Sequence, residues 1–172
     1  MHEQIFTAAP ADRGVLRIGN AQAQTDEPRI QSVFIYNFTK YFSWKKDADP
    51  EFVIGVLGGP ALKAELDKRF ETRPTVDGKP VVVREFKSVE GLTRCHMLVV
   101  PSLQSGKFDE VLARLEGTNT LLITCKEGLG KKGSGINFTK VDGKLRFELN
   151  KAALQKNNIL ASSEIERLSI IL

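Results

Sequence analysis

An uninterrupted apolar run, Phe52-Val53-Ile54-Gly55-Val56-Leu57, is followed directly by the turn residues Gly58-Gly59-Pro60. Six consecutive apolar residues are typical of a strand that is buried on both faces of a sheet. The proline favours the first turn of a helix, which the sequence predicts from Ala61 to about Phe70. A buried strand that leads into a helix is the first half of a β–α–β unit, so the sheet is predicted to be mainly parallel.

The same alternation of apolar runs and helical patterns continues along the middle of the chain. Asp77-Gly78 predicts a tight turn before a strand that starts at Pro80, a position where proline removes no hydrogen bond from the ladder. Helices between parallel strands cover both faces of a sheet, so the predicted fold is α/β, a three-layer sandwich with a mostly parallel sheet. The remaining predicted strands are 80–84, 96–100 and 120–124, and the helices are 88–92 and one from Ser102 or Ser105 to Leu115.

A C-terminal antiparallel hairpin is predicted around Asp142-Gly143, the preferred pair for a two-residue turn. This turn pairs Val141 with Lys144, and Ile136 with Leu149. A hairpin with one apolar face must pack on something, most simply as the edge of the same sheet. The apolar face has Ile136, Phe138, Leu145, Phe147 and Leu149, the opposite face has Asn137, Thr139, Arg146 and Glu148, and the covering helices are predicted at 151–156 and 163–168.

An aromatic helix is predicted to precede the first strand, with Thr25 or Asp26 as its cap and Pro28 in its first turn. Most of its aromatic surface is expected to pack in the core. The flank formed by Tyr36, Lys40 and Trp44 has a second interpretation, in which it faces a partner. The apolar stripe of this helix consists of Ile30, Phe34, Phe38 and Phe42, which recur every four residues.

The chain has 172 residues, a length that one domain accommodates. Residues 1–27 have no sustained period, so we expect them to be disordered and residues 28–172 to form a single domain. Ala21-Gln22-Ala23 is similar to a signal-peptidase site, but charged residues break the apolar segment that a signal peptide requires. The segment is therefore expected to be a leader or a gene-start artefact.

Composition excludes several classes of protein. Two cysteines and two histidines are too few for a disulfide-rich scaffold or for a zinc site built from Cys and His. No apolar stretch reaches the roughly 20 residues that a membrane-spanning helix needs, so direct membrane insertion is not expected. Cys95 and Cys125 are predicted to be free, because one precedes its strand and the other ends the neighbouring parallel strand.

The positive charge is concentrated between residues 120 and 151. This segment has seven basic and three acidic residues, and its excess of four equals the net charge of the whole chain. The excess predicts either a solvated basic surface or a face for an acidic partner or anion. Nucleic acid is not expected as a partner, because no stacking aromatics are interleaved with these bases on an exposed face.

A glycine-rich loop at 128–135 lies inside the basic segment. It lacks the spacing of a phosphate-binding loop, since Ser134 stands where the lysine is required, and it leads into a strand. A tight or flexible turn is predicted, with affinity for anions as the alternative. Because the loop follows the C-terminal end of a parallel strand, a small-molecule or anion crevice around Gly58, Ser102 and Gly128 is the alternative functional hypothesis.

The sequence shows no set of residues typical of catalysis. His96 begins a buried strand with no second histidine and no obvious acid nearby in the sequence, and it is expected to be structural. We find no nucleophile elbow, metal-ligand cluster or carboxylate pair at helical spacing. The chain is therefore predicted to be a binding protein, not an enzyme, and to need no cofactor or metal.

Residues 34–44, Phe-Ile-Tyr-Asn-Phe-Thr-Lys-Tyr-Phe-Ser-Trp, resemble the opening helix of the YfiR family. The resemblance continues in order from about residue 28 to residue 170. It implies a small exported α/β protein of the bacterial periplasm. Further matching segments are Val76-Asp77-Gly78-Lys79-Pro80, Cys95-His96-Met97-Leu98, Gly135-Ile136-Asn137-Phe138 and Arg146-Phe147-Glu148-Leu149-Asn150.

The resemblance also implies a function. The best-understood members repress a membrane diguanylate cyclase by binding its periplasmic sensor domain, and loss of repression raises cyclic di-GMP and favours biofilm. They tend to form dimers, and they respond to redox state through paired cysteines, for which Cys95 and Cys125 are too far apart here. From the local charge and the polar hairpin face, the expected contacts with such a partner are Lys131, Lys132, Asn137, Arg146 and Glu148.

Overall fold

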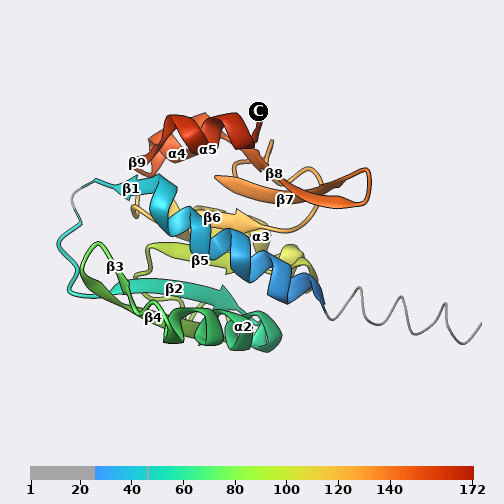
Figure 1. The fold of residues 1–172 in the computed structure, drawn as a ribbon. Coiled ribbons are helices and arrows are strands. Elements are labelled where there is room, and N and C mark those ends of the chain that lie inside the picture. Colours follow the sequence, from blue (N-terminus) through green and yellow to red (C-terminus); the bar gives the residue numbers. More distant parts are fainter. Residues whose placement is uncertain (1–25, 46) are drawn as a thin grey trace, which may run out of the picture.

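The computed structural model describes residues 26–45 and 47–172, and an eight-stranded sheet forms its centre (Figure 1). The strands of this sheet are β2 (Phe52–Leu57), β3 (Thr75–Val76), β4 (Lys79–Phe86), β5 (Met97–Val100), β6 (Leu121–Thr124), β7 (Ile136–Val141), β8 (Lys144–Leu149) and β10 (Ile170–Ile171). Their order is β10-β8-β7-β6-β5-β2-β4-β3. β4, β2, β5, β6 and β7 pair in parallel, which confirms the mostly parallel sheet.

Helices cover both faces of the sheet, so the predicted three-layer α/β sandwich is confirmed. Alternate strand residues enter two separate cores: Ile54 belongs to one, and the adjacent Val53 belongs to the other. The first core is covered by the N-terminal helix (26–41), α2 (Pro60–Glu71), α4 (Lys151–Lys156) and α5 (Ser163–Leu168). The second is covered by α3 (Phe108–Leu115), which follows the 3-10 helix η1 (Ser102–Lys107).

The β7–β8 hairpin has the predicted register, with Val141 opposite Lys144 and Ile136 opposite Leu149. Asp142 and Gly143 have φ angles of 52° and 76°, the left-handed values that a two-residue turn between twisted strands requires. The hairpin is not the edge of the sheet, because β10 pairs in parallel with β8 and takes that position. Two apolar residues at the end of a chain are too few to predict a strand from sequence.

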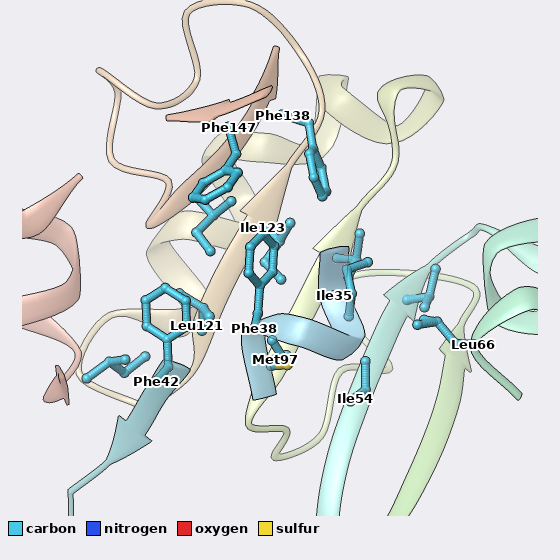
Figure 2. Close-up of a cluster of buried hydrophobic side chains, with 14 of the residues drawn as sticks. Ile35, Phe38, Phe42, Ile54, Leu66, Met97, Leu121, Ile123, Phe138 and Phe147 are labelled. Carbon is cyan, nitrogen blue, oxygen red and sulfur yellow. The ribbon is translucent and has the colours of Figure 1, made fainter. Parts of the chain in front are cut away.

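The N-terminal helix packs on the first core through Phe38, whose side chain is 1% exposed. Its ring centroid lies 5.1 Å from that of Phe147 and 6.0 Å from that of Phe138. Figure 2 shows the Phe38 side chain among residues of the sheet and the hairpin. The first element of the described chain is thereby attached to the C-terminal hairpin.

The buried stripe of this helix differs from the predicted one. Ile35 is fully buried, whereas Ile30 is 40% exposed. A strict spacing of four residues winds around a helix that has 3.6 residues per turn, so the two ends of the predicted stripe could not both face the core. The helix ends at residue 41, and Phe42 belongs to β1 (Phe42–Trp44), which pairs antiparallel with β9 (Ile159–Ala161) in a separate small sheet.

Other boundaries also differ from the predictions. Residues 88–92 form bends and turns instead of a helix, and neither Ser102 nor Ser105 caps α3, whose N-cap is Lys107 without a side-chain bond. Of residues 1–27, which were expected to be disordered, 26 and 27 are helical and the others lie outside the described residues. The two C-terminal helices have their predicted bounds, because Asn150 and Ser162 accept the N-terminal amide bonds of α4 and α5.

Candidate functional site

The glycine-rich loop is fixed to the sheet by Asn137. The Asn137 Oδ1 accepts hydrogen bonds from the Thr124 hydroxyl (2.8 Å) and from the Lys126 amide (3.3 Å). Its Nδ2 donates to Glu148 Oε1 at 2.8 Å. Asn137 is fully buried, so the prediction that it offers its side chain to a partner is wrong. Alternation along the strand correctly placed it on the polar face, but it could not show that the loop folds over this position.

The loop is also held from its other side. Asn150 Nδ2 donates to the Gly130 carbonyl at 2.8 Å, while its Oδ1 caps α4 by accepting from the Ala153 amide at 3.0 Å. A Cβ at Gly130 would lie 2.8 Å from Glu148 Oε1 and 2.7 Å from Leu172, so only glycine fits without displacement. Of the two predicted states, tight and flexible, the contacts favour the tight turn.

Lys131 and Lys132 are exposed and line a hollow of about 400 Å³ between the loop, α3 and α4. Lys156 adds a third ammonium group to its wall, and Asp109 of α3 and Glu116, the residue after α3, add two carboxylates. The apolar part of the lining comes from Leu112, Ala113, Ala152 and Ala153. This hollow can accommodate a side chain or a short segment of a partner that carries negative charge.

Arg146 lies in a different hollow, of about 340 Å³, between the N-terminal helix, β8 and α5. Phe34 and Leu168 contribute apolar walls to it. The five predicted contacts are therefore not one patch: the structure separates the lysines from Arg146, and it places the half-buried Glu148 against the loop. Alternation along β8 predicts that Arg146 and Glu148 share one face of the strand, and the structure agrees. It could not predict the position of the loop, which depends on tertiary contacts.

The residues of the alternative crevice lie beyond the carboxyl ends of the neighbouring strands β2, β5 and β6, as expected from the parallel topology. Gly58 has a φ of 55° and packs closely against the Gln104 side chain, so this side chain occupies the space beside it. Ser102 is exposed at the start of η1, and Gly128 adopts a φ of 89° in the turn after β6. None of these three residues lines either of the two hollows described above.

A buried polar cluster that the sequence analysis missed lies at the opposite, amino-terminal edge of the sheet. The His96 side chain is fully buried, and its Nε2 lies 3.0 Å from Asp47 Oδ1 and 3.7 Å from Asp49 Oδ2. Lys79 Nζ lies 2.7 Å from the second oxygen of Asp47. The imidazole stacks on Phe52 with 4.5 Å between ring centroids. Asp47 precedes β2 and His96 precedes the adjacent β5, so the pairing of parallel strands brings them together.

This cluster resembles a metal site in its residue types, but its hydrogen bonding does not suit one. The Val53 amide donates to His96 Nδ1 at 3.1 Å, which occupies the lone pair of that nitrogen. A neutral imidazole must then carry its hydrogen on Nε2, the atom that faces the carboxylates. A metal would need a lone pair on Nε2, and Lys79 already neutralises Asp47. The cluster is therefore a structural connection between β2, β5 and the segment before β2, as expected for His96.

Electrostatics make this connection sensitive to acid. Burial lowers the pKa of His96 below its usual 6.5, and hydrogen bonding to Asp47 offsets this only in part. Burial would by itself raise the pKa of Asp47, but Lys79 and His96 outweigh it and hold the pKa of this carboxyl well below its usual value. Both groups therefore bind protons more readily in the unfolded chain, so their contribution to stability is present at neutral pH and is lost on acidification.

We expect the free energy of unfolding to fall as the pH drops below about 6.5, and to fall further below about 4, where unfolded aspartate takes up protons. Asp47→Asn removes the contribution of the Asp47 carboxylate to stability. The unfolding free energy of this variant should therefore depend less steeply on pH below about 4. Urea unfolding at pH 7, 5.5, 4 and 3 measures both proteins. Equal slopes for the two proteins would show that Asp47 does not contribute in this way.

Cys95 and Cys125 are both free in the structure. Cys95 belongs to the core under α3 and Cys125 packs against the core on the other face, so the sheet separates them. Burial raises the pKa of each thiol to about 12. Neither thiol is ionised at neutral pH, which gives this pair no basis for redox chemistry with each other.

Comparison with known proteins identifies the family of the chain. A model of the YfiR/HmsC-like family matches residues 28–169. The chain belongs to this family. The match covers nearly all described residues and confirms the resemblance found in the sequence; the family is a regulatory one, associated with cyclic di-GMP signalling. Curated proteins provide no match. None of the helices in the described part of the chain is long and apolar enough to cross a membrane.

Proposed function

We propose that this protein is a non-enzymatic periplasmic regulator that binds and represses a membrane signalling partner, the periplasmic sensor domain of a diguanylate cyclase. The family match over residues 28–169 carries the proposal. A regulator of this kind changes its partner only through different affinities for the partner's conformations. Repression therefore requires tighter binding to the inactive conformation of the sensor domain.

The loop that presents Lys131 and Lys132 suits such a contact. Hydrogen bonds at Gly130 and Asn137 hold the loop in place, so little conformational entropy is lost when a partner binds. The two exposed ammonium groups favour an acidic segment of the sensor domain, which would enter the hollow beside α3. Arg146 forms a second contact point across the hairpin, on the side of α5.

Reversing the loop charges should weaken partner binding. For Lys131→Glu combined with Lys132→Glu, we expect about a tenfold or larger loss of affinity, because attraction becomes repulsion at the contact. Arg146→Glu tests the second contact point separately. Calorimetric titration with the isolated sensor domain of the cyclase encoded beside this gene measures the affinity, and cyclic di-GMP levels in cells report repression.

A matched control is Lys87→Glu with Lys107→Glu, which reverses two exposed lysines distant in sequence from the loop. This control should retain binding. The salt dependence of its affinity for the sensor domain should change only as far as its lower net charge dictates. Undiminished binding by both the loop variant and Arg146→Glu would reject this surface. Absence of binding by the unaltered protein would reject the cyclase as partner.

The proposal includes a homodimer, supported by the apolar edge of the sheet. Leu168 is 57% exposed and Ile171 in the edge strand β10 is 48% exposed. An edge strand with exposed apolar side chains can pair with a second copy of the chain. Sedimentation equilibrium decides this point: a monomer across the micromolar range removes the homodimer from the proposal without affecting the partner site.

A further inference from the structure

Folding brings basic side chains together between the N-terminal helix and α2, although the linear sequence shows no excess of charge there. Arg29 and Lys40 of the N-terminal helix line one hollow of about 480 Å³ together with residues from the end of α2. The residues from α2 and the turn after it are Glu65, Lys68, Arg69, Thr72 and Arg73. Five cationic side chains therefore surround this basic groove, whereas Glu65 is the single carboxylate of its lining.

The groove continues into a second hollow of about 540 Å³, which shares Tyr36, Lys40 and Arg73 with the first. Asp77 is the acidic residue in this extension. The N-terminal helix and α2, whose residues line the first hollow, run next to each other on one side of the sheet (Figure 1). The basic groove is thus a feature of two helices, separate from the loop that presents Lys131.

The Arg69 side chain, which lines the groove, is fixed in position by a hydrogen bond. Its Nε donates to the buried Ser32 hydroxyl at 3.2 Å, and that hydroxyl donates to the Arg29 carbonyl at 2.6 Å. This chain of bonds connects the two helices and leaves the two terminal nitrogens of the half-buried guanidinium as further donors. Lys40 Nζ lies 4.6 Å from the centre of the Tyr36 ring, which orients a second cation.

The carboxylates nearby do not neutralise these charges. Lys68 lies 3.5 Å from Glu65 and Arg29 lies 3.7 Å from Asp26, but the cation of each pair is largely exposed and such pairs are weak. Within the described residues, Arg73 has no carboxylate partner. Five cations with two weak pairs leave a net positive field in a concave site, which concentrates anions.

Helix stability explains only part of this arrangement. Lys68 and Arg69 lie in the last turn of α2, where positive charge is favourable to the helix dipole. This preference of α2 cannot account for Arg29 and Lys40, which lie on the N-terminal helix.

We propose that the basic groove binds a phosphate-bearing anion. Three guanidinium groups, from the N-terminal helix, α2 and the turn after α2, favour phosphate, because each can donate two parallel hydrogen bonds to phosphate oxygens. The same chemistry is offered by a soluble phosphate ester and by the head group of an anionic phospholipid. A phospholipid would hold the protein at the membrane surface, next to a membrane partner.

Two probes distinguish these sources. Inorganic pyrophosphate in calorimetric titration represents the soluble anion. Co-sedimentation with vesicles of phosphatidylcholine containing about 30% phosphatidylglycerol, compared with phosphatidylcholine alone, represents the membrane surface. Binding of pyrophosphate without retention on the anionic vesicles identifies a soluble ligand. Retention on the anionic vesicles identifies a lipid head group.

The variant Arg29→Gln with Arg73→Gln should weaken binding of the effective probe by about tenfold or more. Both side chains are exposed, so thermal unfolding should change little. Lys87→Gln with Lys107→Gln removes the same charge outside the groove and should change binding by less than about twofold. Failure of both probes, or equal losses in the two variants, overturns the proposal. The loop variant that tests partner binding leaves this groove intact, so the two proposals can fail separately.

Discussion

Phe38→Ala should lower the free energy of unfolding by about 3–5 kcal/mol, the usual range for removing a buried phenylalanine ring. The Phe38 ring lies among those of Phe34, Phe42, Phe138 and Phe147, so its loss opens a cavity between the N-terminal helix and the hairpin. Urea unfolding followed by circular dichroism measures the loss. We also expect the helix to become more accessible to hydrogen exchange than the parallel strands.

Val33→Ala is the matched control, because Val33 lies on the same helix and is 38% exposed. Its truncation should cost less than about 1 kcal/mol. Phe38→Leu keeps most of the buried volume and tests the prediction even if the alanine variant does not fold; its cost should be about 1–2 kcal/mol. Similar costs for Val33→Ala and Phe38→Leu would show that the helix does not pack on the sheet through Phe38.

His96→Ala should lower the free energy of unfolding by roughly 2–4 kcal/mol through two separate effects. The fully buried ring leaves a cavity beside Phe52, and the Val53 amide loses its acceptor. The Asp47 carboxylate keeps Lys79 as a partner, so the variant does not leave an isolated buried charge. The midpoint of thermal unfolding should fall by roughly 5–15 °C, measured by differential scanning calorimetry.

Asp49→Asn provides the comparison for this site. Asp49 lies 3.7 Å from His96 Nε2 and pairs with Arg94 at 3.1 Å, but it is partly exposed. Pairs of this kind contribute little, so the change should cost less than about 1 kcal/mol. A small effect of His96→Ala, equal to that of Asp49→Asn, would contradict the structural role of the imidazole.

The parallel sheet could be predicted because its strands are continuous apolar runs, and the hairpin because Asp142-Gly143 determines its turn locally. The edge strand β10 and the β1–β9 pair could not, since their stability comes from strands distant in the sequence. The missed stripe of the N-terminal helix has a similar cause. Its aromatic residues occupy several faces of the helix, and tertiary packing decided that Ile35 would be buried instead of Ile30.

For the candidate site, too, some features could be predicted from the sequence and others could not. Lys131, Lys132 and Arg146 were identified from local charge and are exposed, but Asn137 is buried because the loop closes over it. The sequence did contain a signal for Asp47: acidic residues just before one parallel strand can meet a histidine just before the next. The basic groove had no linear signal, because the segment before residue 74 is not rich in net charge and only the packing of two helices brings Arg29 close to Arg73.

The pairing of β1 with β9, and of β8 with β10, has a consequence for synthesis of the protein. These pairings use β9 and β10, which follow the hairpin in the sequence, and Phe38 requires the hairpin itself. A nascent polypeptide therefore cannot complete its core until β9 and β10 have left the ribosome. Until then the core remains open, and an open chain of this kind is recognised by proteases and chaperones.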